Sequence, residues 1–465
     1  MSNWEPVIGL EIHVQLKTRT KMFCGCELSF GEEPNTRTCP VCLGLPGTLP
    51  VTNAQAVRYG IMMGLALGCE IAPRSIFHRK NYFYPDLAKG YQISQYDIPL
   101  CRGGRLGDVR IHRIHLEEDA AKLVHIGTSG RIHGSDASVV DYNRGGTPLA
   151  EIVTEPDLHS AEQARDWLQL LRETLRQLGV SDVNMEEGSL RCDANVSIRP
   201  AGSSELGTKT ELKNMNSFRF VMQGINAEIK RQIALVEAGE PVVQETLHFD
   251  PSSGRLSSLR SKEEAHDYRY FPEPDLVPLV ATEEMLESAR AAIPELPAER
   301  SARYESDFGL APETAYLFSF EPEWGDYFEK ATAGADPKAT AIWVTELRSR
   351  DGRSVEPGDL AKLVSLVTAK TVTAAAARTI LDKMVAEGGD PAEIAEREGL
   401  TAMEDSGELE AIVAKVIAEN PDVVERIKGG NAKAIGALVG PVMRETKGRA
   451  DGGEVNRLLR NALGV

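Results

Sequence analysis

Val7–Leu16 reads V-I-G-L-E-I-H-V-Q-L, a stretch in which apolar and polar side chains alternate. A period of two predicts a β-strand, because successive side chains of a strand point to opposite faces of the sheet. One face would pack on a core, and the other would carry Glu11, His13 and Gln15. The carboxylate and the imidazole then stand side by side, either as one wall of a metal-dependent active site or as the wet face of an ordinary amphipathic strand.

Two later segments bring further carboxylates to expected strands. Arg110–Glu118 reads R-I-H-R-I-H-L-E-E and delivers Glu117 and Glu118 at its end. A regular strand would place Glu117 on the face of His115, whereas a bulge would present Glu118 instead. Glu151 lies within the apolar run P-L-A-E-I-V, where a buried carboxylate needs a cation or a bound metal as its partner.

Together these residues indicate a class of chemistry. Carboxylates from three strands and one imidazole suit Mg²⁺ or Mn²⁺ better than a closed zinc site. A divalent ion held by a few carboxylates, with water and substrate phosphates completing its shell, is typical of phosphoryl transfer. The chain contains no G-x-x-x-x-G-K-[ST] motif, which excludes a P-loop enzyme.

Four of the seven cysteines cluster near the N-terminus in a segment with little hydrophobic periodicity. Cys24 and Cys26 have one residue between them, and Cys39 and Cys42 have two. Two such thiolate pairs can supply the four tetrahedral ligands of a structural zinc ion, which would order a loop-rich insert at about residues 24–42. The alternative is four reduced cysteines in a loop. An odd number of cysteines does not indicate a disulfide framework.

Cations and aromatic rings are interleaved in the loop R-K-N-Y-F-Y-P-D. The loop contains Lys80, Tyr82 and Asp86, and Lys89 follows it. This combination suits a nucleotide or a nucleotide-bearing substrate through stacking and phosphate contacts, although a surface loop with incidental tyrosines has the same composition. Arg144 precedes two glycines in a turn that permits close backbone approach to a ligand.

The composition of the 465 residues, with 42% hydrophobic and 26% charged, is typical of a soluble globular protein. We expect a cytoplasmic location, because no apolar run approaches the roughly 20 residues of a membrane span and no secretory signal is seen. The net charge of −17 argues against broad non-specific binding of nucleic acid. Arg426–Val465 is the exception, with eight Lys/Arg against three Asp/Glu. This surface would attract a phosphate backbone, although a solvated helix pair is the alternative.

The order of the patterns predicts an α+β fold in three domains. Residues 1–292 combine strand patterns with two helices, one predicted over Ser160–Leu178 and the other from about Ser217 to Ala238. They should form a mixed-sheet cradle domain that carries the catalytic site. The run I-P-E-L-P marks a change of character at Ile293. Residues 293–402 are predicted to form an all-α domain, and residues 403–465 a small all-α tail domain.

Many strings of the sequence resemble one known family. They are V-I-G-L-E-I-H-V-Q-L, R-K-N-Y-F-Y-P-D, Y-Q-I-S-Q-Y-D, H-L-E-E-D-A, D-Y-N-R-G-G-T-P-L-A-E-I-V-T-E-P-D, M-E-E-G-S-L-R-C-D-A-N, E-L-K-N-M-N-S-F and D-Y-R-Y-F-P-E-P-D-L-V-P. They resemble the B subunit of bacterial aspartyl/glutamyl-tRNA amidotransferases. A-I-G-A-L-V-G-P-V-M-R-E-T-K-G-R-A-D resembles the tail domain of that protein, so the resemblance covers essentially the whole chain.

The resemblance implies a heterotrimer, in which an amidase-type A subunit hydrolyses glutamine and a small C subunit joins the pair. The B subunit would use ATP and Mg²⁺ to phosphorylate the side-chain carboxylate of misacylated Asp-tRNA(Asn) and/or Glu-tRNA(Gln). Ammonia from the A subunit would then displace phosphate to give Asn-tRNA or Gln-tRNA, the reaction of an ATP-dependent carbon–nitrogen ligase. A non-catalytic tRNA-binding subunit of the same complex is the alternative.

The resemblance also implies roles for particular residues. Glu11, His13 and Glu151 would be catalytic. The ligands of Mg²⁺ would be Glu11, His13, Glu117, Glu118 and Glu151. The nucleotide or the aminoacyl end would contact Lys80, Tyr82, Asp86, Lys89 and Arg144. The structural zinc would be held by Cys24, Cys26, Cys39 and Cys42, and the tail domain would contact tRNA.

Overall fold

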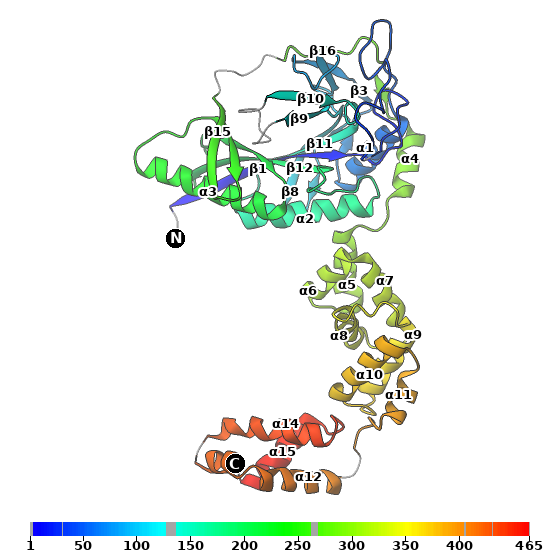
Figure 1. The fold of residues 1–465 in the computed structure, drawn as a ribbon, viewed down its shortest axis with the longest axis vertical. Coiled ribbons are helices and arrows are strands. Elements are labelled where there is room, and N and C mark those ends of the chain that lie inside the picture. The colour runs from blue at the N-terminus through cyan, green and yellow to red at the C-terminus, as the bar shows by residue number, and fades with distance from the viewer. Residues whose placement is uncertain are drawn as a thin grey trace. The chain divides into compact units, whose positions relative to one another are not determined.

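The computed structural model describes residues 3–29, 31–126, 136–261, 268–403, 406–429 and 431–464. The chain divides into two compact units, Met1–Pro297 and Ala298–Val465. The first unit combines a large sheet with helices, and the second is helical throughout its described part (Figure 1). The predicted α+β class is therefore confirmed, with the mixed sheet in the N-terminal part of the chain.

A ten-stranded sheet is the framework of the first unit. Its strands in spatial order are β15 (Arg255–Ser261), β14 (Glu245–Asp250), β13 (Thr210–Met215), β12 (Leu190–Pro200), β1 (Trp4–Gln15), β11 (Pro148–Thr154), β8 (Val109–Glu118), β6 (Cys101–Arg102) and β2 (Glu70–Ile71), with β7 (Arg105–Leu106) beside β8. The central strand β1 runs antiparallel to both of its neighbours. The sheet is mixed because β13 and β14 pair in parallel.

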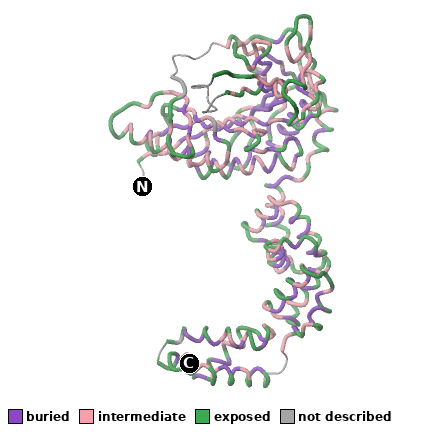
Figure 2. The backbone as a smooth tube through the Cα atoms, viewed as in Figure 1, coloured by how far each residue is buried: buried purple, intermediate pink, exposed green. Residues whose placement is uncertain are grey.

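The alternation in β1 separates a core face from a polar face. Ile8, Leu10, Ile12 and Val14 are at most 1% exposed and belong to the main hydrophobic core of the unit. Figure 2 shows buried residues along the sheet and the helices that cover it. Because this face is buried, the register of β1 is specified strongly, and its polar residues are held on the opposite face.

Two helices cover the sheet where the sequence predicts them. α2 (Ala161–Gln177) and α3 (Phe218–Glu237) pack against each other, and both run along one side of the sheet in Figure 1. Each begins after a serine, Ser160 or Ser217, whose side chain accepts a backbone N–H of the first turn. α1 (Ala54–Ala66) begins in the same way after Asn53 and packs against β8.

Smaller sheets bring distant segments of the first unit together. A three-stranded sheet joins β5 (Tyr91–Ser94), β4 (His78–Asn81) and β16 (Phe271–Pro272). Two further two-stranded sheets pair β9 (Lys122–Ile126) with β10 (Ala137–Asp141) and β3 (Arg74–Ser75) with β17 (Leu279–Val280). The last element of the unit is α4 (Glu283–Ala292). The first residues of the predicted cation-rich loop, Arg79–Asn81, thus belong to β4, which pairs with residues almost 200 positions later in the chain.

The second unit consists of short helices around two separate cores. The helices are α5 (Pro297–Phe308), α6 (Pro312–Phe320), α7 (Pro322–Ala331), α8 (Pro337–Arg348), α9 (Pro357–Thr368), α10 (Ala374–Glu387), α11 (Pro391–Arg397), α12 (Ser406–Glu419), α13 (Pro421–Lys428), α14 (Gly436–Glu445) and α15 (Gly452–Leu463). Many begin with proline, whose fixed φ and missing N–H suit the first helical position. One core lies between Tyr304 and Leu400, and the other between Leu409 and Leu463.

The three-domain division at residues 292 and 402 remains a prediction. The two compact units meet at Pro297, and the two cores of the second unit lie on either side of residue 402. Within the described ranges, none of the helices combines the length and apolar character that crossing a bilayer requires.

Candidate active site

Three neighbouring strands place His13, Glu151 and His115 in one row across the sheet. His13 of β1 pairs with Glu151 of β11, and Glu151 pairs with His115 of β8. Residues that are directly opposite in antiparallel strands point to the same face. One oxygen of Glu151 lies 3.5 Å from Nε2 of His13 and 3.3 Å from Nε2 of His115. The carboxylate of Glu151 is therefore the centre of the row.

Glu117 and Glu11 complete the polar group on this face. Nε2 of His13 lies 3.8 Å from an oxygen of each. Ligand atoms of His13, Glu117 and Glu151 all lie within 4.8 Å of one another, close enough to hold one metal ion. Atoms of Glu11, His13 and Asp193 form a second such group. Of the five predicted Mg²⁺ ligands, the structure thus brings four together.

Glu118, the fifth predicted ligand, lies apart from this group. The pairing of β8 with β11 is regular at Glu117 and Glu118, without the bulge that would present Glu118 on the polar face. The carboxylate of Glu118 instead accepts hydrogen bonds from the ammonium of Lys89 and from the N–H of Ile93. Glu117 accepts a hydrogen bond from Ser94 Oγ, with 3.0 Å between the oxygens. Glu117 therefore belongs to the polar group around His13, whereas Glu118 pairs with Lys89 on the other face of the strand.

The electrostatics of the group follow from burial and from mutual contacts. Burial is the largest single influence on these groups, and it opposes their charged forms. The imidazole of His115 nevertheless lowers the pKa of Glu117, and the two imidazoles lower that of Glu151 well below its usual value. In return, the carboxylates raise the pKa of His13 and raise that of His115 to about 9. Burial and the charge of Glu151 raise the pKa of Glu11. The contacts between the imidazoles and the carboxylates thus favour the charged forms that burial opposes.

The polar group lines a pocket that also contains cations and aromatic rings. Lys80, Arg113, Tyr96 and Tyr270 contribute to its walls. Arg113 lies 3.3 Å from Glu151, and the rings of Tyr96 and Tyr270 stack with their centroids 4.4 Å apart. Burial opposes the charge of Lys80, but nearby carboxylates and tyrosines outweigh it and raise its pKa. The pocket combines an acidic wall for a cation with basic groups for an anion.

The other four predicted nucleotide-binding residues are not among the described residues that line this pocket. Tyr82 contacts the ring of Tyr268 edge-on, and burial raises its pKa to about 12. Burial also raises the pKa of Asp86. Arg144 donates to the backbone carbonyls of residues 120 and 121. Lys89 lines a second pocket, beside the cysteines, together with its partner Glu118. Among the described residues that line the acidic pocket, Lys80 is the only one of the five predicted nucleotide-binding residues.

Sequence reasoning missed several members of the site. His115 was predicted to share a face with Glu117 but was not assigned to the site, and Asp193 was not considered. The alternation around Cys192 carried the signal for Asp193, because an inward thiol places the next residue outward. Lys213 of β13 lies 2.8 Å from Asp193 and adds a further cation to this face. The register between strands, which no local pattern reveals, decides that these side chains meet.

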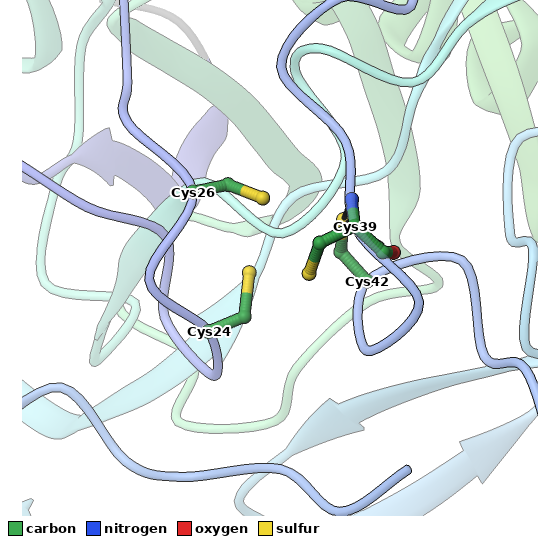
Figure 3. Close-up of side chains that lie close together, drawn as sticks. All are labelled: Cys24, Cys26, Cys39 and Cys42. Atoms are coloured by element: carbon green, nitrogen blue, oxygen red, sulfur yellow. Dashed lines mark hydrogen bonds between the residues drawn. The ribbon is translucent and has the colours of Figure 1, made fainter.

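The four clustered cysteines converge in space. Figure 3 shows Cys24 and Cys26 on one loop facing Cys39 and Cys42 on another. Their sulfur atoms all lie within 4.8 Å of one another, so the group could hold a metal ion. The N–H of Cys39 donates to Sγ of Cys42 at 3.2 Å. The hydrogen bond from Cys24, with a lesser contribution from the charge of Lys21, lowers the pKa of Cys42 to about 4.

Comparisons with known proteins agree with this arrangement. Residues 6–287 match the GatB/GatE catalytic domain, and residues 326–463 match the GatB domain. The B subunit of the aspartyl/glutamyl-tRNA(Asn/Gln) amidotransferase of Carboxydothermus hydrogenoformans is 50% identical, over 100% of this chain and 99% of its own length. The B subunit of the same enzyme from Geobacter sulfurreducens is also 50% identical, over 99% of both chains. The resemblance found in the sequence is confirmed, and the chain belongs to the GatB family.

Proposed function

We propose that this chain is the subunit of a glutamine-dependent amidotransferase that activates and amidates an amino acid attached to tRNA. The substrates are Asp-tRNA(Asn) and/or Glu-tRNA(Gln), and the products are Asn-tRNA(Asn) and Gln-tRNA(Gln). One observation carries the proposal. In a member of this family, carboxylates of three strands and His115 share a pocket with Lys80 and Arg113. Such a pocket suits phosphoryl transfer to a carboxylate.

The chemistry explains why ATP is needed. A carboxylate does not react directly with ammonia, because an oxide ion is a very poor leaving group. Attack of a side-chain oxygen on the γ-phosphorus of ATP releases ADP and forms an acyl phosphate. Ammonia then adds to the carbonyl carbon, and phosphate leaves with the original carboxylate oxygen. Both steps place negative charge on phosphate oxygens, which cationic groups of a pocket stabilise.

The donor set fits a magnesium ion. Glu11, His13, Glu117 and Glu151 offer mainly carboxylate oxygens with one imidazole nitrogen, which Mg²⁺ and Mn²⁺ accept. When bound, the ion would neutralise charge on the phosphates of ATP. The ion would also take the place of the imidazoles of His13 and His115 as the counter-charge of Glu151.

The surrounding residues orient the substrates in this proposal. Lys80 and Arg113 face the pocket and would bind phosphate oxygens. The stacked rings of Tyr96 and Tyr270 offer a flat apolar wall beside them. Contacts of Tyr82, Asp86, Lys89 and Arg144 with the nucleotide or the aminoacyl end stay predictions.

The metal of the cysteine group is proposed to be zinc. Four thiolates can fill all four coordination positions of a tetrahedral zinc ion, which is typical of a structural zinc site. The segment around them needs such a clamp, because many of its residues, such as Leu45 and Leu49, are exposed rather than packed. The zinc would order the insert without taking part in the reaction.

The names of the relatives support the proposal of partner subunits. Relatives that are named as B subunits imply a complex of several chains, and we infer an amidase-type A subunit as the ammonia source and a small C subunit. The pocket of this chain would receive ammonia rather than generate it. Cytoplasmic location is proposed as well, since tRNA charging takes place there.

The proposal is tested by ATP hydrolysis in the assembled complex. Asp-tRNA(Asn) or Glu-tRNA(Gln) should stimulate ADP release, whereas the same tRNA without its amino acid should not. Glu11→Ala should remove this stimulation and leave glutaminase activity in place. Normal amidation by the Glu11→Ala complex would contradict the proposal and favour a chain that only binds tRNA.

The tail is proposed to bind tRNA through its basic residues. Lys428, Lys433 and Lys447 are exposed and have no carboxylate within 4.0 Å in the part of the chain that the structure describes. Removing the chain from about Gly407 onward should weaken tRNA binding at least about tenfold, because several phosphate contacts are lost, and should leave glutamine hydrolysis intact.

Filter binding at two salt concentrations measures this effect. A triple Lys→Gln variant at residues 428, 433 and 447 keeps the helices and serves as the matched control for folding. It should reduce the dependence of tRNA affinity on salt. Unchanged affinity in both the truncated and the neutralised chains would rule out the tail as a tRNA contact.

A further inference from the structure

Lys21 is a buried cation whose partners are uncommon. Its side chain is 1% exposed, among the most deeply buried of the larger residues. Its ammonium donates to the backbone carbonyl of Tyr142 at 3.0 Å and lies 3.8 Å from Sγ of Cys42. Among the described residues, no carboxylate lies within 4.0 Å of this nitrogen. A buried charge without a counter-charge is strongly unfavourable, so the cysteine group is the available source of negative charge.

The charge of the proposed zinc site matches this requirement. Four thiolates and one Zn²⁺ have a net charge of −2, which a buried site must offset by hydrogen bonds or cations. The N–H of Cys39 already donates to Sγ of Cys42. The ammonium of Lys21 is a second donor directed at the same sulfur, and it adds a full positive charge.

Lys21 also connects the cysteines to the turn Asp141–Thr147. Its backbone N–H donates to the carbonyl of Cys26 at 3.0 Å, while its ammonium holds the carbonyl of Tyr142. Its side chain packs against Gly146, where an added Cβ would lie 3.3 Å from Cδ of Lys21. This glycine has a φ of +88°, so the turn depends on glycine both for its backbone and for the space that the lysine fills.

The insert and the turn are joined by further hydrogen bonds. Asn35 donates to the side chain of Asp141 and accepts from the N–H of Tyr142. The N–H of Arg37 donates to the side chain of Asn143 at 2.8 Å. The turn leads directly into β11, which carries Glu151. An ordered insert therefore supports the start of the strand at the centre of the acidic group.

We propose that Lys21 is the counter-ion of the four-cysteine metal site. When metal is bound, the ammonium group of Lys21 holds the turn Asp141–Thr147 in place. The inference rests on the proposed zinc site. Lys21 is a positioning residue in this account, since it contacts neither substrate nor the acidic group.

Metal affinity tests the inference in the full-length chain. Lys21→Met keeps an unbranched, apolar side chain that is one atom shorter and removes the charge. It should weaken zinc binding about 10- to 100-fold in competition with a chromophoric chelator. Lys17→Met, an exposed lysine on the neighbouring segment that pairs with Asp182, is the matched control and should not change the affinity. Circular dichroism checks that each variant is folded.

Cobalt substitution provides a second measurement, which should not change if Lys21 has only a structural role. The thiolate-to-cobalt charge-transfer band should shift to longer wavelength in Lys21→Met, because a sulfur that loses a cation becomes a better electron donor. In the unmodified chain, removal of the metal should speed hydrogen exchange at the amides of Tyr142 and Gly145, and leave α3 unchanged.

The outcomes separate this inference from the zinc proposal. A wild-type chain without thiolate-bound zinc or cobalt would overturn both. A wild-type chain that binds metal, with equal affinity and an unshifted band in Lys21→Met, would overturn the role of Lys21 alone. Exchange in the turn that does not respond to metal removal would overturn the coupling of metal to turn.

Discussion

Replacing Glu151 by glutamine should lower the rate of tRNA-dependent amidation at least about 10²-fold, with glutamine hydrolysis retained. Glu151 lies between His13 and His115 and supplies an oxygen to the group that would hold magnesium. Glutamine has almost the same volume, so the change removes charge while the packing is preserved. The loss should therefore appear in ATP-dependent activation, measured by ADP release with Asp-tRNA or Glu-tRNA. Raised magnesium concentration should restore part of the rate.

Glu173→Gln is the matched control for this substitution. Glu173 is a similarly buried carboxylate in the same unit, but it lies on α2 and pairs with Arg176. Its replacement should leave amidation within about twofold of the original rate, because Glu173 lies on a helix and is not among the described residues that line the acidic pocket. Equal rates for the Glu151→Gln and original complexes would show that the acidic group does not act in catalysis.

Replacing Cys42 by serine should remove zinc from the chain and disorder the insert around it. The sulfur of Cys42 receives N–H and ammonium contacts from Cys39 and Lys21, so its loss removes both a ligand and the supports of that ligand. Structural zinc contributes about 10–16 kcal/mol of binding free energy in small zinc-binding peptides, far more than the few buried residues of the insert can replace. Metal analysis and limited trypsin digestion should show loss of zinc and rapid cleavage between residues 17 and 51.

Cys69→Ser is the control for loss of a thiol. Cys69 is buried away from the cluster and should leave the zinc content unchanged. Zinc retained at the original content in Cys42→Ser would mean that the four sulfurs do not form the metal site. Loss of zinc without any change in trypsin cleavage would mean that the metal does not order the insert.

The regular elements of the first unit could be predicted because their signals are local. The helices predicted from Ser160 and from about Ser217 begin one residue later, at Ala161 and Phe218, because each serine caps its helix by accepting a first-turn N–H. β1 was predicted from period-two alternation over Val7–Leu16, and it extends from Trp4 to Gln15. The additional residues at its start pair with the end of β12, a contact that depends on a distant segment.

The site could be predicted only in part, because its assembly is not local. Alternation placed Glu11 with His13, and Glu117 with His115, each on one face of its own strand. The rows across strands depend on register, which places Glu151 opposite both histidines. Glu117 and Glu118 are adjacent in sequence, yet the pleat directs them to two different pockets. Two-residue strands such as β16 are defined by partners almost 200 residues away, and no local pattern marks them.

The central claim is that the acidic pocket directs phosphoryl transfer from ATP to the tRNA-linked carboxylate. The most direct measurement uses misacylated tRNA whose side-chain carboxylate carries ¹⁸O on both oxygens, with ATP, glutamine and the assembled complex. We predict that the released phosphate carries one ¹⁸O atom and the amide product keeps the other, and that Glu151→Gln suppresses this transfer. Unlabelled phosphate formed alongside the amide would contradict the account, because ATP would then have been hydrolysed by water.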